Sequence, residues 1–173
     1  SNRLTKVKLG YAHPLIHQAF TAVNEAGGTR HYEMASHLVQ NNHHVTIITS
    51  PVSYMTGGKN EPVNQQVTGE AFSGRLRIIR SYSIPALHKS FFHRLLNFFS
   101  FMVSSFLKGL AARQVDLVWG TTPPIFQAVT GWLLARLKRV PYVLEVRDLW
   151  PDFAIDVGVL NNRFLISASR WLE

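Results

Sequence analysis

The chain has 173 residues, about the length of one globular domain, and a chain of this size can bury roughly 70% of the surface that it exposes when unfolded. It contains no cysteine, which excludes disulfides and thiolate metal sites and fits a reducing compartment. Its 18 lysines and arginines against 10 acidic residues give a formal net charge of +8, which favours partners that carry phosphate.

Much of the positive charge falls in one segment of the chain. No acidic residue lies between Glu70 and Asp116, whereas seven basic residues do: Arg75, Arg77, Arg80, Lys89, Arg94, Lys108 and Arg113. Such a segment attracts phosphates generally, whether of nucleic acid, of anionic lipid headgroups or of a pyrophosphate-bearing substrate. These residues lack the interleaved exposed aromatic side chains of a nucleic-acid reader motif, so we expect no nucleic-acid partner.

The first part of the chain predicts two strands with a helix between them. Residues 7–12 form a short apolar-rich run, and Val45–Thr49 is a nearly continuous β-branched run, typical of a strand that is covered on both faces. Between them, Thr29 is a good N-cap for a helix whose apolar residues recur at helical spacing until Asn41 and Asn42 close it.

A glycine pair, Gly27 and Gly28, immediately precedes this helix. Glycine lets a ligand approach the backbone closely, and the free amides and dipole of a helix N-terminus favour phosphate. A tight turn that needs a positive φ angle explains the pair equally well, and the pattern is not the full G-x-G-x-x-G fingerprint. The local sequence leaves both interpretations open.

The middle of the chain predicts a strand and a long apolar helix. Leu76–Tyr82 is predicted as a strand, hairpinned with residues 67–72. The helix predicted over Phe91–Leu110 carries its polar residues in one thin stripe: His93, Asn97, Ser100, Ser104 and Lys108. Arg94 and Asn97 make it a poor membrane span. It is either a helix packed on the sheet or one that also places part of its apolar face on a membrane surface.

The last part of the chain alternates strand, helix and strand. Asp116–Gly120 and Pro141–Val146 are predicted strands, and Ile125–Lys138 is the helix between them, which ends in basic residues. A final helix is predicted over Arg163–Leu172. The alternation predicts an α/β fold: a Rossmann-like three-layer sandwich with a mostly parallel sheet, in a single domain over residues 1–173.

Ligands of such a sheet sit at the carboxyl ends of its strands. The last predicted strand runs into a charged, aromatic turn at Arg147–Asp152, which we expect to share a cleft with the glycine pair. Asp148 in this turn is either a functional carboxylate, or an N-cap or salt-bridge partner of Arg147 or Arg30.

Three motifs carry a resemblance to a known family: G-G-x-R-x-x-E beginning at Gly27, T-T-P-P at Thr121 and E-V-R-D-L-W-P at Glu145. With them the chain resembles the N-terminal domain of family-4 glycosyltransferases, enzymes of the two-domain GT-B architecture. It is most similar to the bacterial subgroup that builds exopolysaccharides and O-antigens. The resemblance covers nearly the whole chain and implies that the sandwich is one half of a GT-B fold.

The implied activity is a retaining transfer of a sugar from a nucleotide diphosphate sugar, without a metal, to an acceptor held by this domain. His13 and His17 stand four residues apart but have no evident third ligand, so the residues themselves also predict no metal. We expect a lipid-linked or oligosaccharide acceptor and a role in polysaccharide biosynthesis. The expected location is cytoplasmic, peripheral at the inner face of the cell membrane.

The resemblance also implies roles for individual residues. The backbone at Gly27, Gly28 and Thr29 approaches the donor's diphosphate. Asp148 lies near the transferred sugar, where a carboxylate can stabilise an oxocarbenium-like state or accept the acceptor's proton. The acceptor side is formed by residues from several loops: Arg30, His31, Thr121, Arg147 and Trp150.

Two neighbours of Asp148 have further interpretations. Trp150 is either a platform for the acceptor or a core residue. Glu145 alternates with Arg147 on the predicted strand and is expected to orient it, which is a structural role.

The family's second nucleotide-binding domain, with its glutamate pair, is absent from these 173 residues, so we expect a fragment that is inactive alone. The loop over residues 13–26 is also longer than the family's compact form. Two other functions remain open. One is a non-catalytic module that docks on a membrane or a partner; the other is a GT-B-like epimerase, which would isomerise a nucleotide sugar without any acceptor.

Overall fold

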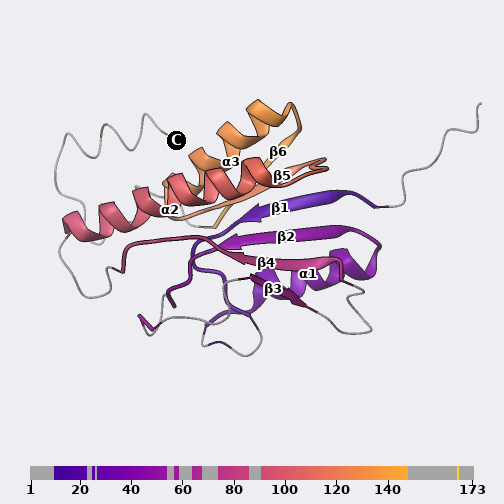
Figure 1. Ribbon diagram of the computed structural model, residues 1–173, viewed down its shortest axis with the longest axis horizontal. Helices are drawn as coiled ribbons and strands as arrows, with labels where there is room; N and C mark the ends of the chain where they lie inside the picture. Colours follow the sequence, from indigo (N-terminus) through magenta and orange to yellow (C-terminus); the bar gives the residue numbers. More distant parts are fainter. Residues whose placement is uncertain are drawn as a thin grey trace, which may run out of the picture.

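The computed structural model describes residues 10–22, 25, 27–53, 57–58, 64–67, 74–85, 91–147 and 167. These residues form one six-stranded sheet flanked by helices (Figure 1). The strands are β1 (Ala12–Ile16), β2 (His44–Thr49), β3 (Asn64–Val67), β4 (Leu76–Arg80), β5 (Val118–Thr122) and β6 (Tyr142–Val146). The helices are α1 (Arg30–Gln40), α2 (Phe91–Ala111) and α3 (Ile125–Lys138).

The sheet has the strand order β3-β4-β2-β1-β5-β6. Neighbouring strands are parallel except at one edge, where β3 pairs antiparallel with β4. The prediction of a Rossmann-like α/β sandwich with a mostly parallel sheet is therefore confirmed. The chain leaves β1 through α1 toward β2 on one side, and later passes through α2 to β5 on the other side. The carboxyl ends of β1 and β5 thus flank the point where the strand order reverses, which is where such sheets bind ligands.

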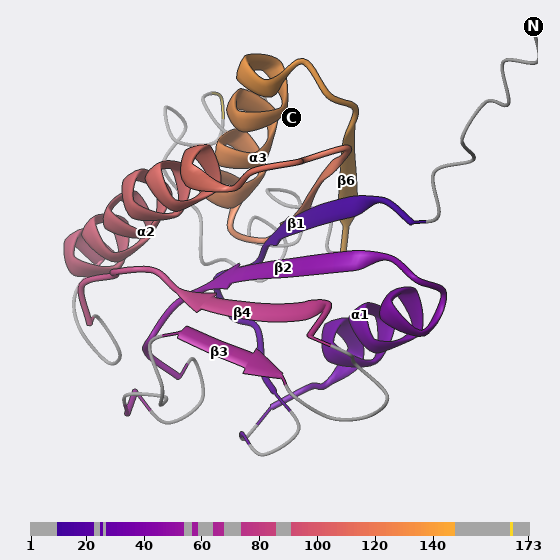
Figure 2. The same cartoon turned by 45° about the vertical axis from the view of Figure 1, so that its right-hand side comes forward.

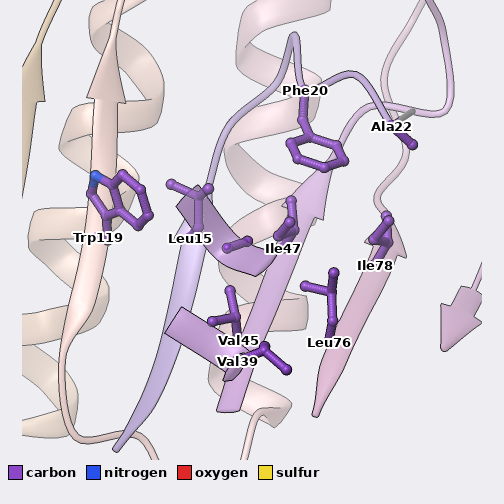
Figure 3. Close-up of a cluster of buried hydrophobic side chains, with 10 residues drawn as sticks. Leu15, Phe20, Ala22, Val39, Val45, Ile47, Leu76, Ile78 and Trp119 are labelled. Carbon is purple, nitrogen blue, oxygen red and sulfur yellow. The ribbon is translucent and has the colours of Figure 1, made fainter. Parts of the chain in front are cut away.

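Alternating side chains of the sheet serve two separate cores. On one face, Leu15 and Trp119 belong to a cluster that α1 covers with residues such as Val39 (Figure 3). Their chain neighbours Ile16 and Val118 point to the opposite face, where they pack with side chains of α2 and α3. The pair α2 and α3 therefore lies across the sheet from α1 (Figure 2). Burial on both faces explains why the central strands are rich in β-branched residues.

The first strand lies later in the chain than the sequence predicts. The prediction of a strand over residues 7–12 is wrong: β1 is Ala12–Ile16, and residues 7–9 lie outside the described part of the chain. Gly10 has a φ angle of 96°, which is not an extended conformation. Pro14 lies inside β1 and cannot donate a ladder hydrogen bond, so the segment does not look like a central strand in the sequence.

The other predicted elements occur close to where the sequence places them. The bounds of α3 match the predicted Ile125–Lys138, whereas β5 begins at Val118, two residues later than predicted. The hairpin partner of β4 is β3, so Val67 is in the hairpin but residues 68–73 lie outside the described part. The predicted final helix, residue 167 apart, also lies outside it.

Tyr142 holds β6 against α3. A Cβ atom added at Gly120 or Gly131 would lie 2.4 or 2.7 Å from an atom of the Tyr142 side chain, so both glycines leave room for this ring. The hydroxyl donates a hydrogen bond of 2.8 Å to the carbonyl oxygen of Ala128. Burial raises the pKa of the Tyr142 phenol, which keeps the donor proton in place.

We expect Gly131→Ala to lower the free energy of unfolding. In an ordinary helix interior this change stabilises by about 1 kcal/mol, but here the new methyl group collides with a ring pinned by its hydrogen bond, and overpacking costs roughly 1–3 kcal/mol. Urea denaturation measures the difference. Gly28→Ala is the matched control, since no atom lies within 4 Å of a Cβ added there. A Gly131→Ala protein more stable than the unmodified chain would contradict this packing.

Candidate functional site

Polar side chains collect at the carboxyl edge of the sheet. His17 and Gln18 follow β1, and Thr121 and Thr122 end β5. Arg147 follows β6. The first turn of α1 reaches the same place, because the rings of His17 and His31 have centroids 4.3 Å apart. The structure therefore brings the first turn of α1 and the last strand together, since Glu145 of β6 contacts His31. The turn predicted to share a cleft with the glycine pair lies, Arg147 apart, outside the described residues.

A carboxylate of β6 joins that strand to α1. The Oε1 atom of Glu145 lies 2.6 Å from Nη2 of Arg30, and its Oε2 atom lies 2.9 Å from Nε2 of His31. The sequence prediction gave Glu145 the task of orienting Arg147 and left its partners on α1 unnoticed. The G-G-x-R-x-x-E and E-V-R-D motifs contain all three residues, but their pairing spans 114 positions and is invisible to local patterns.

Two buried imidazoles lie beneath this ion pair. His17 is 3% exposed and His31 is 4% exposed. Burial lowers the pKa of His17 to about 3, and the charges of His31 and Arg147 act in the same direction. Burial also lowers the pKa of His31, although its hydrogen bond with Glu145 and the charge of that carboxylate oppose the shift. Both rings are therefore neutral at neutral pH, and His31 donates its Nε2 proton to Glu145.

The rim of the site is positively charged. Arg30 and Arg147 are exposed, and each lies near enough to His31 to lower the pKa of that imidazole. With both imidazoles neutral, the charged groups that the described residues bring together here are these two guanidinium groups and the carboxylate of Glu145. The local surplus of positive charge suits an anionic ligand.

The two glycines before α1 have different physical roles. Gly27 has a φ angle of 140°, and a Cβ atom there would lie 2.6 Å from Oγ1 of Thr21, so this position requires glycine. Gly28 has no positive φ angle and is exposed, with open space where a Cβ would stand. The tight-turn interpretation therefore accounts for Gly27, and the approach of a ligand remains the interpretation for Gly28.

The hydroxyl of Thr29 does not cap the helix. Thr29 is the N-cap residue, as predicted, but its Oγ1 atom donates to Oε1 of Glu33 at 2.7 Å, and no side chain caps the amides of the first turn. Uncapped amides at a helix N-terminus attract anions. The start of α1 is thus open next to Gly28 and Arg30.

Gln127 braces the other side of the edge. Its Oε1 atom accepts a 2.7 Å hydrogen bond from the amide of Gln18, and its Nε2 atom donates to the carbonyl oxygen of Pro123 at 3.0 Å. This fully buried glutamine ties the turn after β1 to the turn after β5. The sequence prediction missed it because a glutamine inside an apolar helix pattern gives no signal of its own.

The remaining predicted site residues are placed as follows. Thr121 is fully buried, with its hydroxyl 3.4 Å from the carbonyl oxygen of Thr122. Asp148 and Trp150 lie outside the described residues. Within the described part of the chain, no three His, Asp or Glu side chains gather as metal ligands would.

Fold and site together define an α/β domain of the Rossmann-like class with a basic ligand edge. The sequence model of a family described as glycosyl transferase 4-like domain matches residues 26–173, far more than half of the chain. The chain therefore belongs to the glycosyl transferase 4-like domain family, which confirms the resemblance to family-4 glycosyltransferases.

Other comparisons concern the fold alone. The chain is similar in structure to the C-terminal domain of a hydrogenase from Pyrococcus furiosus, with a TM-score of 0.50 and 16% sequence identity over 80% of this chain and 92% of that one. At this identity the likeness supports the α/β architecture and nothing about activity. No curated protein sequence matches the chain.

We expect the buried imidazoles to make the fold sensitive to acid. Burial lowers the pKa of His17 from its usual 6.5 to about 3 in the fold, so protons favour the unfolded chain. Its contribution to stability is complete above about pH 6.5 and is lost as the pH falls toward 3. Between these limits the free energy of unfolding should fall more steeply for the unmodified chain than for His17→Gln, by up to about 1.4 kcal/mol per pH unit.

Urea denaturation at a series of pH values measures these slopes. Tyr142→Phe is a suitable control, because it loses a hydrogen bond without removing a group that titrates in the acidic range. Its slope should run parallel to that of the unmodified chain. Equal slopes for His17→Gln and the unmodified chain would contradict a neutral, buried His17.

Proposed function

We propose that this chain is the acceptor-side domain of a retaining glycosyltransferase. The enzyme transfers a sugar from a nucleotide diphosphate sugar to a lipid-linked glycan acceptor in polysaccharide biosynthesis. One observation carries the proposal: an open, glycine-led helix N-terminus and two exposed arginines meet at the point of the sheet where the strand order reverses. Membership in the glycosyl transferase 4-like domain family supports the reaction class.

The donor's diphosphate is assigned to the start of α1. Gly28 leaves the backbone open on its exposed side, and the amides that follow Thr29 point their positive end toward an anion. Gly27 holds the turn that sets this geometry. The guanidinium groups of Arg30 and Arg147 balance the phosphate charge, so the proposed donor site needs no metal ion.

The acceptor is assigned to the loops after β5 and β6. Arg147 and Arg30 are exposed at this edge and can hold acidic or hydroxyl groups of a glycan. His31 and Thr121 are buried, so they support the wall of the proposed site from beneath. We assign Trp150, in the turn after β6, as a stacking surface for a sugar ring.

Asp148 is the proposed catalytic residue. It follows Arg147 directly, at the carboxyl end of β6, where the reacting groups of such sheets lie. Departure of the nucleotide diphosphate leaves positive charge on the anomeric carbon, and a nearby carboxylate lowers the energy of that state. It can also accept the proton of the attacking hydroxyl group.

A second domain completes the proposed enzyme by holding the nucleotide across the cleft from this one. The proposed working location is the inner face of the cell membrane, where a lipid-linked acceptor presents its glycan to the cytoplasm. This chain alone is then expected to bind ligands weakly and to turn over no substrate.

We expect Gly28→Ala to weaken donor binding without unfolding the domain. The added methyl group meets no atom of the protein within 4 Å, so any effect comes from the space that it denies to a ligand. In an enzyme that contains this chain and the second domain, the KM for the nucleotide sugar should rise about tenfold, which corresponds to about 1.4 kcal/mol. Met34→Ala, which changes an exposed side chain of α1, is the control. An unchanged KM would remove Gly28 from the donor site.

We expect Asp148→Asn to lower kcat roughly 100-fold, since a positioned carboxylate contributes about this factor or more. Transfer of radiolabelled sugar in the same two-domain enzyme measures the rate, with Asp152→Asn from the same turn as the control. Transfer at the normal rate in Asp148→Asn would refute the catalytic assignment. Isomerisation of the nucleotide sugar in the absence of acceptor would favour the epimerase instead.

A further inference from the structure

The middle of the polar stripe of α2, Asn97, Ser100 and Ser104, is hydrogen-bonded to the protein itself, whereas His93 and Lys108 at its two ends are exposed. The Nδ2 atom of Asn97 donates to the carbonyl oxygen of Ile84 at 2.5 Å, and the amide of Ile84 donates to Oγ of Ser100 at 3.0 Å. One turn further along, Oγ of Ser104 donates to the carbonyl oxygen of Tyr82 at 2.5 Å. These bonds attach α2 to the segment that follows β4 and fix the rotation of the helix about its axis.

With this rotation, α2 turns an apolar stripe outward. Phe101, Ser105 and Gly109 are buried on the inner side of the helix. The outer side exposes six large apolar residues that recur every three or four positions: Phe92, Leu96, Phe99, Val103, Leu107 and Leu110. Phe92 is 63% exposed and Leu107 is 60% exposed, values that are high for side chains of this kind. Along the middle of the helix, the polar side chains therefore contact the protein and this apolar stripe contacts solvent.

The neighbouring helix α3 extends this surface. It packs beside α2, where Phe98 stacks on Phe126 with ring centroids 5.9 Å apart. Trp132, Leu133 and Leu137 are exposed on α3. We call these three residues and the outer stripe of α2 the α2–α3 apolar surface. Large apolar side chains exposed on two packed helices indicate an interaction site.

The excess of positive charge around the α2–α3 apolar surface indicates an anionic partner. Residues 91–139 contain six lysines and arginines but one acidic residue, Asp116, whose carboxylate accepts a hydrogen bond from the amide of Ala12. The exposed guanidinium of Arg136 lies 5.9 Å from the ring centroid of Trp132. Tryptophan, arginine and lysine beside large apolar side chains are typical of helices that lie in the interface of an anionic bilayer. A second copy of this chain would bring like charges together.

We infer that the α2–α3 apolar surface docks on a bilayer that contains anionic lipids, with the two helices lying in its interface. No helix in the described part of the chain has the length and hydropathy to cross a bilayer, so the surface lies on the membrane. The inference deepens the proposed function, on which it rests for the identity of the membrane. The Nε2 atom of Gln18, which follows β1, donates to Oδ1 of Asn97 at 2.6 Å, so the N-terminal half of α2 adjoins the ligand edge. Docking would therefore bring a lipid-linked acceptor next to the candidate site.

Co-sedimentation of the 173-residue chain with vesicles tests the inference. One set of vesicles is pure phosphatidylcholine and the other contains 30% phosphatidylglycerol, and each is assayed at low and high salt. The double variant Phe99→Glu and Leu107→Glu should lower the partition coefficient on anionic vesicles at least tenfold. Met34→Glu is the control for each of the two added charges, because it places one glutamate on an exposed apolar position of α1, across the sheet. It should change binding less than twofold.

Each outcome is decisive. Binding that requires phosphatidylglycerol, weakens in high salt and is lost only in the double variant supports the inference, provided that urea denaturation gives the double variant a normal midpoint. No binding to anionic vesicles overturns it. Self-association without lipid that the double variant abolishes would assign the surface to a second copy instead. Vesicle binding does not require sugar transfer. A failure to bind vesicles would therefore not contradict the donor-site predictions, and a failure of the donor-site predictions would not contradict membrane docking.

Discussion

The candidate site depends on one carboxylate that reaches across the sheet. Glu145 lies near the end of β6, beside the first turn of α1, and binds both Arg30 and His31. Without it, no carboxylate of the described residues would pair with Arg30 and His31 at this place. The pair fixes where Arg147, two residues further on, leaves the sheet. The helix N-terminus and the last strand thus form two walls of a single edge.

The chemistry of this edge follows from burial. His17 and His31 are held neutral, since a charge beneath the ion pair would lack solvent, and the positive charge of the site is confined to the exposed arginines. The open backbone at Gly28 lies beside them. An anion bound at this edge would therefore contact backbone dipoles and guanidinium groups at the surface. The imidazoles lie below them, buried and uncharged.

In α2, too, different residues stabilise the fold and remain available to a partner. Its serine and asparagine side chains form hydrogen bonds with the backbone of Tyr82 and Ile84 after β4. The apolar residues that remain cannot all face the core, because the sheet and α3 cover one side of the helix only. The outward stripe is the consequence, and the bond from Gln18 to Asn97 places the N-terminal half of the same helix beside the ligand edge.

The sequence by itself determined the elements whose signals are local: α3 to the residue, the start of α1 at Thr29, and the order of strands and helices that predicts the parallel sheet. Its three motifs also identified the family. The prediction failed at β1, where Pro14 obscures the strand. It also did not separate the roles of Gly27 and Gly28, because the residue type alone does not determine the backbone angles. Only the tertiary structure decided that Glu145 binds α1 and that the middle of the polar stripe of α2 binds the segment after β4. Both depend on contacts between residues that are far apart in the chain. Helical or strand periodicity indicates which residues share a face, but not which element packs against that face.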